Sequence, residues 1–301
     1  MMEDQITAAR IANAICQDTS FVGTYLLVEG KRDVKLYGKF VDKPSVRVKA
    51  TWGKYKLREV YGILRDRGIS NALGIRDADF LRIKGNSKYN KNFEEAIFAT
   101  DHHDAEVMIA FSGAVDEYFS LISDDEQIRQ FEKKIGRPVF DLAISLCYEI
   151  GCLRLANKRL SLGLSFKPEK PEGNKIKLHK FIDASNWSVS RALLINTVWE
   201  YSQNRGFVVA SRDDMMKAVE LISSEDHSIN ELINGHDLSA VLHFISTSGL
   251  KSKNKLLQDS GCVEDLLIAV FDIRRFSATE LYEKTSNWSK EKIGVSVFQS
   301  P

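Results

Sequence analysis

The chain has 301 residues, of which 44% are hydrophobic and 28% are charged, the composition of an ordinary folded protein. Its 42 Lys and Arg residues nearly balance 41 Asp and Glu residues, which leaves a formal net charge of +1. A protein that coats nucleic acid through its overall charge is more basic, so we expect any nucleic-acid contact to be confined to local surfaces.

The cysteines and the apolar runs predict the compartment. Cys16, Cys147, Cys152 and Cys262 lack the spacing of common zinc sites, and we expect free thiols, as in a reducing compartment. The polar residues 1–20 do not resemble a signal peptide, and no apolar run is long enough to cross a bilayer. We therefore expect a cytoplasmic protein without membrane contact.

The first third of the chain alternates between strands and helices. Helical periodicity and short apolar runs are the signals used. They predict strands at 24–28, 46–50, 72–76 and 97–100, and helices at 4–17, 33–40, 57–64 and from 104 to 111. Such alternation is typical of a parallel sheet with right-handed crossovers, so the expected fold class is α/β, a parallel sheet flanked by helices.

Beyond residue 114 the pattern becomes mainly helical. We predict helices at 126–134, 139–151, 189–204, 212–223, 238–246 and 263–271, and a loop at 167–177. The chain is therefore expected to divide into a catalytic core at 1–113 and a mainly helical domain at 114–301 for dimerisation, partner or substrate binding.

Acidic residues follow two of the predicted strands. Glu29 comes directly after 24–28, with Asp33 one helical turn later, and Asp77 and Asp79 follow 72–76. Ligands of parallel sheets bind beyond the carboxyl ends of the strands, where these side chains would meet. Crowded carboxylates repel one another unless a cation lies between them, and Mg²⁺ or Mn²⁺ suits oxygen ligands. Whether Glu29 is a metal ligand or a general acid/base stays open.

These segments resemble the motifs of TOPRIM domains. Leu26-Leu27-Val28-Glu29-Gly30-Lys31-Arg32-Asp33 is similar to the first motif, a hydrophobic strand followed by Glu-Gly and then Asp, and Gly74-Ile75-Arg76-Asp77-Ala78-Asp79-Phe80 is similar to the Asp-x-Asp motif. Trp52-Gly53-Lys54 resembles the Gly-Lys element after the second strand. The resemblance covers about residues 20–112 and implies a catalytic Glu29 and a metal-binding pair, Asp77 and Asp79.

A narrower resemblance spans most of the chain. The segments 100–108 (TDHHDAEVM) and 235–238 (GHDL) are similar to elements of OLD-like TOPRIM nucleases, whose members include the effector of the PARIS anti-phage system. It implies that Asp33, Asp104 and Glu106 complete the metal shell. It also implies a toxic endonuclease that acts as a dimer, is released from an ABC-type ATPase partner and cleaves cellular RNA such as tRNA.

Several basic residues are candidates for contacts with phosphate. Lys54 lies at the same predicted sheet edge as the acids, and we expect it to contact phosphate as part of the catalytic set. We predict phosphate contacts also for Lys31, Lys175 and Lys177, and the alternative for all four is a solvated lysine. Two basic stretches, one with Lys167, Lys170, Lys175, Lys177, His179 and Lys180 and one with Lys251, Lys253 and Lys255, are candidate nucleic-acid contacts.

Aromatic and histidine side chains complete the expectations. Trp187 and Trp199 are expected in the cores of helices rather than as platforms for bases. One of His102 and His103 is a candidate for assisting phosphate chemistry, and two adjacent histidines do not suit a closed zinc site.

Three rival interpretations remain. An OLD-type DNA nuclease would use the same acids on another substrate. A catalytically silent module that acts through protein contacts would have no need of Glu29, Asp77 and Asp79 together. A receiver-like phosphoacceptor domain needs paired acids after its first strand and a lone acid after its third, the reverse of the order in this chain.

Overall fold

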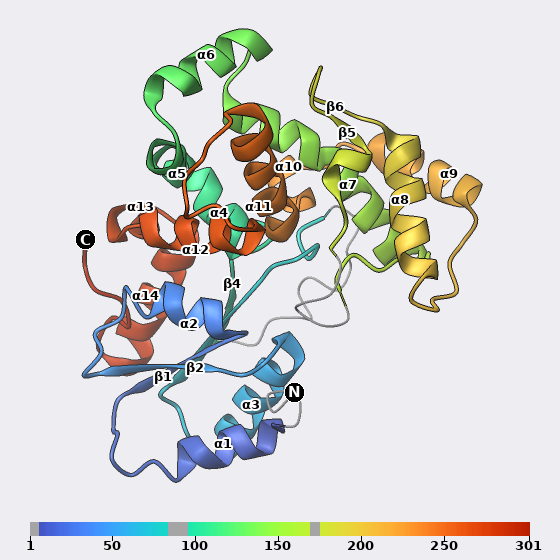
Figure 1. The fold of residues 1–301 in the computed structure, drawn as a ribbon. Coiled ribbons are helices and arrows are strands. Elements are labelled where there is room, and N and C mark those ends of the chain that lie inside the picture. The colour runs from blue at the N-terminus through green and yellow to red at the C-terminus, as the bar shows by residue number, and fades with distance from the viewer. Residues whose placement is uncertain (1–5, 84–95, 169–174) are drawn as a thin grey trace. The chain divides into compact units, whose positions relative to one another are not determined.

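The computed structural model describes residues 6–83, 96–168 and 175–301 (Figure 1). It divides into two compact units, residues 1–114 together with 267–301, and residues 115–266. The first boundary lies one residue from the predicted one at 113, but the last segment of the chain joins the first unit instead of the second. Of the basic residues predicted to contact nucleic acid, Lys170 lies outside the described residues.

The first unit is built on a parallel sheet. Within the described residues its strands are β1 (Thr24–Val28), β2 (Val46–Ala50), β3 (Ala72–Arg76) and β4 (Ile97–Ala99), in the order β2-β1-β3-β4, and every neighbouring pair is parallel. This arrangement confirms the predicted α/β fold class, and the bounds of the first three strands match the prediction.

Burial along each strand explains its place in the sheet. All five residues of β1 are buried, as expected for a central strand that is covered on both faces. In β2 the side chains of Arg47 and Lys49 are exposed, and charges of this kind protect an edge strand from pairing with other chains. The predicted alternation in β2 therefore marked the edge of the sheet.

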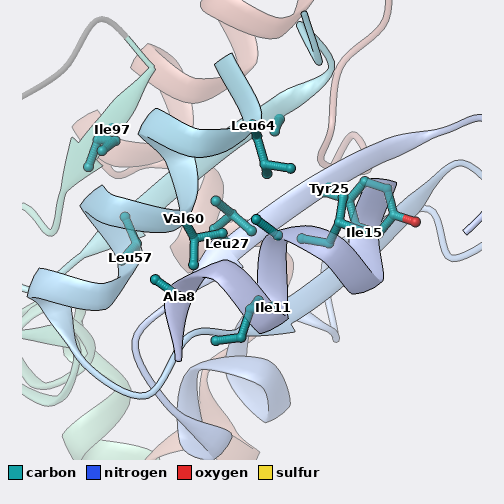
Figure 2. Packing of buried hydrophobic residues seen from close by; sticks show 11 residues of the cluster. Ala8, Ile11, Ile15, Tyr25, Leu27, Leu57, Val60, Leu64 and Ile97 are labelled. Carbon is teal, nitrogen blue, oxygen red and sulfur yellow. The ribbon is translucent and has the colours of Figure 1, made fainter. Parts of the chain in front are cut away.

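Helices cover the sheet. The first unit contains α1 (Ala8–Cys16), α2 (Lys31–Tyr37), α3 (Lys54–Asp66), α4 (Ala105–Ile109), a π-helical segment Ala110–Ala114, α13 (Ile273–Ser277) and α14 (Glu280–Ile293), and the boundary with the second unit falls inside α12 (Ser260–Val270). Figure 2 shows Ile11 and Ile15 of α1 and Val60 of α3 packed around Leu27 of β1. Gly74 of β3 allows the close approach of α3, because a Cβ atom there would lie 2.8 Å from Leu57 Cδ2.

The C-terminal segment returns to this unit through aromatic packing and backbone hydrogen bonds. Phe276 of α13 stacks on Phe40 with ring centroids 4.7 Å apart and contacts Phe298 edge-on. The backbone N–H of Gln299 donates to the Phe40 carbonyl at 2.8 Å. These long-range contacts explain why the predicted domain 114–301 does not hold for its last residues.

The second unit is mainly helical, as predicted for that part of the chain. Its elements are α5 (Val115–Ile122), α6 (Asp125–Ile135), α7 (Val139–Leu160), a 3₁₀ turn Leu178–Lys180, β5 (Ile182–Asp183), β6 (Ser188–Val189), α8 (Arg191–Gln203), α9 (Arg212–Ser223), α10 (Ile229–Leu232), α11 (Gly235–Phe244) and a π-helical segment Ile245–Gly249. The long helix α7 packs against α9 and α11. No described helix is both long enough and apolar enough to cross a membrane.

Candidate metal centre

Glu29 and Asp77 are joined through the backbone at the carboxyl end of the sheet. β1 and β3 are parallel neighbours, so the residues that follow them lie side by side. The backbone N–H of Asp77 donates to Glu29 Oε1 at 3.1 Å, and Asp77 Oδ1 in turn accepts from the N–H of Ala105, the first residue of α4, at 3.2 Å. The structure thus brings together two of the predicted site residues and the segment that carries Asp104 and Glu106.

Asp79 lies at the same edge but is held by cations. Its Oδ2 is 2.5 Å from Lys54 Nζ and 3.8 Å from a guanidinium nitrogen of Arg76, which is itself buried at the end of β3. Asp79 has φ 50°, in the left-handed region that few residues other than glycine adopt. Its partner Lys54 is the lysine predicted to act with the acids.

Asp33 and Asp104 have structural partners as well. Asp33 Oδ2 accepts from the Gly30 N–H at 2.8 Å and so caps α2. Asp104 is the N-cap of α4, with Oδ1 accepting from Val107 N–H at 3.0 Å and Oδ2 3.0 Å from His103 Nδ1. Since both oxygens of Asp104 are engaged, we assign it to positioning α4.

Burial, with the charge of neighbouring acids second, raises the pKa of three of these carboxyls. Burial, followed by the charge of Asp79, raises the pKa of Glu29 from 4.5 to about 7. Burial is also the main cause that raises the pKa of Asp33 from 3.8 to about 6, and the charge of Asp104 adds to it. For Asp77, burial and then the charge of Glu29 raise the pKa well above its usual value, and the charges of Asp104, Asp33 and Glu106 act in the same direction.

The donor set fits a hard divalent cation. Among the described residues, no three of these carboxylates bring ligand oxygens within 4.8 Å of one another, so they do not form a closed shell by themselves. Mg²⁺ keeps several waters and takes only some ligands from the protein. Repulsion between the carboxylates adds to the effect of burial on these pKa values, and a bound cation relieves that repulsion.

The loop after β4 contains positioning residues that the motifs did not single out. Thr100 Oγ1 accepts from the Ala78 N–H at 3.1 Å and donates to the His102 carbonyl at 2.9 Å, which ties the Asp-x-Asp turn to this loop. The Arg82 guanidinium donates to the carbonyls of the same loop, including that of Asp101 at 2.8 Å. Such bonds to backbone carbonyls leave no sequence signal.

Asp101 and the two histidines have separate environments. The Asp101 carboxylate accepts the backbone N–H groups of Glu280 and Leu281 at 2.8 and 2.7 Å, so it caps α14 and holds the C-terminal segment. His103 is 3% exposed and lies edge-on to Phe80, whereas burial lowers the pKa of His102. The His103 ring contacts one of the candidate acids, with Nδ1 3.0 Å from Asp104 Oδ2.

The predicted phosphate-binding lysines separate into the two units. Lys31 begins α2, and its Nζ lies 5.3 Å from the centre of the Trp52 ring. Lys175 and Lys177 are exposed in the second unit. In the GHDL segment, Asp237 forms a two-point ion pair with Arg154, which gives it a structural role in the packing of α11 on α7.

No protein-family profile matches the chain, and a search of curated proteins finds no relative.

All four cysteines are free, as their spacing predicted.

Proposed function

We propose that the chain is a Mg²⁺-dependent endonuclease, as the resemblance to TOPRIM nucleases implies. The observation that supports it most directly is the group of partly buried carboxylates at the carboxyl edge of the sheet, in which burial and then neighbouring carboxylate charge raise the pKa of Glu29, Asp33 and Asp77. A purely structural role does not explain this group, because unpaired buried charge destabilises a fold.

Each residue has a role that its environment supports. Glu29, Asp77 and Asp79 would hold the cation, with Asp33 and Glu106 adding negative charge around it. The bound ion would polarise a phosphodiester and stabilise the leaving oxygen. Lys54, which is 2.5 Å from Asp79 Oδ2, places a positive charge beside the acids for a phosphate oxygen. Glu29, with a pKa of about 7, is suited to exchange a proton near neutral pH if it is not a ligand.

The finer proposal follows the same resemblance. We propose a cytoplasmic toxic effector of anti-phage defence that cleaves RNA such as tRNA, acts as a homodimer and is restrained by an ABC-type ATPase. Free cysteines fit a reducing compartment. An OLD-type DNA nuclease and a silent interaction module remain the competing functions.

The test is cleavage of total cellular RNA and of supercoiled plasmid by the purified full chain, with Mg²⁺ or with EDTA. Asp77→Asn should lower the rate at least a hundredfold, since it removes a ligand charge but keeps a side chain of the same size. Asp66→Asn, an exposed acid at the end of α3, is the matched control and should cut normally.

The outcomes separate the competing functions. Mg²⁺-dependent cleavage of RNA that Asp77→Asn abolishes supports the proposal, and cleavage of plasmid alone favours the DNA nuclease. If neither substrate is cut and calorimetry finds no Mg²⁺ binding by the folded chain, the silent module is the better explanation.

A further inference from the structure

The second unit contains a cavity of about 800 Å³ that combines aromatic rings with basic side chains. Phe131 of α6, Trp187 and Phe244 of α11 line it, with Trp187 edge-on to the other two rings at centroid distances of 5.4 and 5.8 Å. This volume is in the range of small-ligand pockets. Trp187 is 6% exposed and so belongs to a core as predicted, but it lies in the β5–β6 connection instead of a helix, and its ring lines the cavity.

Basic residues from distant parts of the chain line the same cavity. Lys134 comes from the end of α6, Lys180 and His179 from the 3₁₀ turn, and Lys251 from the segment after α11. All four are exposed, and none forms an ion pair with another described residue. The cavity therefore unites two residues of the first basic stretch, one residue of the second and Lys134, with one acid, Asp183, on its lining.

The backbone is strained where it shapes this cavity. Trp187 has φ 54° and Lys251 has φ 56°, both in the left-handed region that disfavours residues with a Cβ atom. Gly249 lies under the rings, because a Cβ atom there would be 2.7 Å from Phe131 and 3.0 Å from Trp187. Strain of this kind persists where surrounding structure imposes it and is concentrated at ligand sites.

The apolar part of the lining extends to solvent. Leu193 of α8 lines the cavity and is 51% exposed, an unusual amount for a leucine beside buried aromatic rings. A ligand that covers Leu193 and the aromatic rings gains from apolar burial, and the lysines at the opening favour negative charge on the same ligand. A flat base joined to a phosphate has both properties, whereas an acidic peptide lacks the flat ring.

We propose that this cavity binds one nucleoside phosphate unit, with its base against Trp187 and Phe244 and its phosphate beside Lys134, Lys180 and Lys251. The source of that unit is a single-stranded RNA segment, so the cavity is a substrate-holding site of the proposed nuclease and rests on that function. A free nucleotide has the same chemistry, and the test below distinguishes the two sources.

The first measurement is fluorescence anisotropy of a labelled single-stranded RNA oligonucleotide in EDTA, with the full chain. We compare Lys134→Gln/Lys180→Gln/Lys251→Gln with a control of equal charge change at exposed basic residues of the same unit that lie outside both basic stretches, Arg129→Gln/Lys158→Gln/Lys217→Gln. The cavity variant should bind at least tenfold more weakly. Its plot of log affinity against log salt should be less steep by about 0.7, because the cavity neutralises one phosphate of a single strand.

A second measurement uses the fluorescence of Trp187 to test whether a base contacts its ring. The oligonucleotide should quench tryptophan fluorescence in the wild type, and Trp187→Phe should remove most of that quenching whereas Trp199→Phe keeps it. Trp187→Phe retains an aromatic ring in the core, so circular dichroism should show a folded protein. If adenosine monophosphate displaces the oligonucleotide from the wild type but not from the cavity variant, the site is assigned to free nucleotides, which have the same chemistry.

Two results would overturn the proposal: equal loss of affinity in the cavity and control variants, or RNA binding that neither variant alters. Because binding is measured without metal and cleavage is measured separately, the two proposals fail separately. Mg²⁺-dependent cleavage that persists in the cavity variant at unchanged KM contradicts only the cavity, and binding without any cleavage contradicts only the nuclease.

Discussion

Replacing Glu29 by glutamine is expected to stabilise the protein in the absence of metal while it weakens Mg²⁺ binding. Glutamine keeps the oxygen that accepts from the Asp77 N–H at 3.1 Å, so the hydrogen bond that joins the two strand ends remains. It removes the charge that burial and Asp79 disfavour. A residue that destabilises the fold and is needed for activity is typical of a functional site.

The magnitude follows from the pKa of Glu29. Its rise from 4.5 to about 7 corresponds to about 3 kcal/mol, at about 1.4 kcal/mol per pKa unit. The folded protein binds a proton at Glu29 more tightly than the unfolded chain does. The cost is therefore absent below pH 4.5, grows between pH 4.5 and 7, and is complete above pH 7.

Urea unfolding in EDTA at pH 5 and pH 8 measures this cost. Glu29→Gln should be more stable than the wild type by about 1–3 kcal/mol at pH 8 and by less than about 1 kcal/mol at pH 5. Glu59→Gln, an exposed glutamate of α3, controls for the change in net charge. Adding Mg²⁺ should stabilise the wild type more than the variant. Equal gains at both pH values, or no gain at pH 8, would refute the electrostatic account of this site.

Three further predictions concern the same unit. Mg²⁺ must displace protons from Glu29 and Asp33, whose pKa values are about 7 and 6. The Mg²⁺ affinity measured by calorimetry should therefore rise several-fold from pH 6 to pH 7.5 and then level off. An affinity that does not change with pH would argue against these acids as ligands. Lys54→Gln removes the ion pair between Lys54 Nζ and Asp79 Oδ2, which are 2.5 Å apart. Mg²⁺ should then bind a few times more tightly while kcat falls, and weaker Mg²⁺ binding would contradict this reasoning. Asp101→Ala removes two hydrogen bonds at the start of α14 and should lower the free energy of unfolding by about 1–3 kcal/mol, whereas Asp116→Ala on an exposed face should not.

The sheet and the placement of its acids could be predicted because they depend on local patterns. Each of the first three strands is a short run bounded by polar or glycine residues, and parallel pairing then aligns their carboxyl ends. Glu29 and Asp77 meet for that reason alone. The role of Asp104 as a helix cap was also within reach, because an aspartate before an apolar helical stretch is a common helix start.

The return of the C-terminal segment could not be predicted in the same way. α14 is held by Asp101, and Phe298 packs on Phe276, across sequence separations that no local pattern reports. The surplus of aromatic residues after position 270 was the available signal, since such side chains need a core to enter. Their partner surface, formed by α2 and the residue Phe40 after it, was visible only in the structure.

The cavity in the second unit shows the same limit for function. Lys134, Lys180 and Lys251 are ordinary solvated lysines when each is considered in its own segment, and the net charge of +1 gives no indication of them. Their possible function appears only in the tertiary structure, where all three line one cavity. Gly249 allows the rings of Phe131 and Trp187 to approach closely in that cavity. The local basic surface that the proposed nuclease would need is thus assembled by tertiary structure. A variant that replaces these three lysines together, compared with one that replaces three other basic residues, tests this surface.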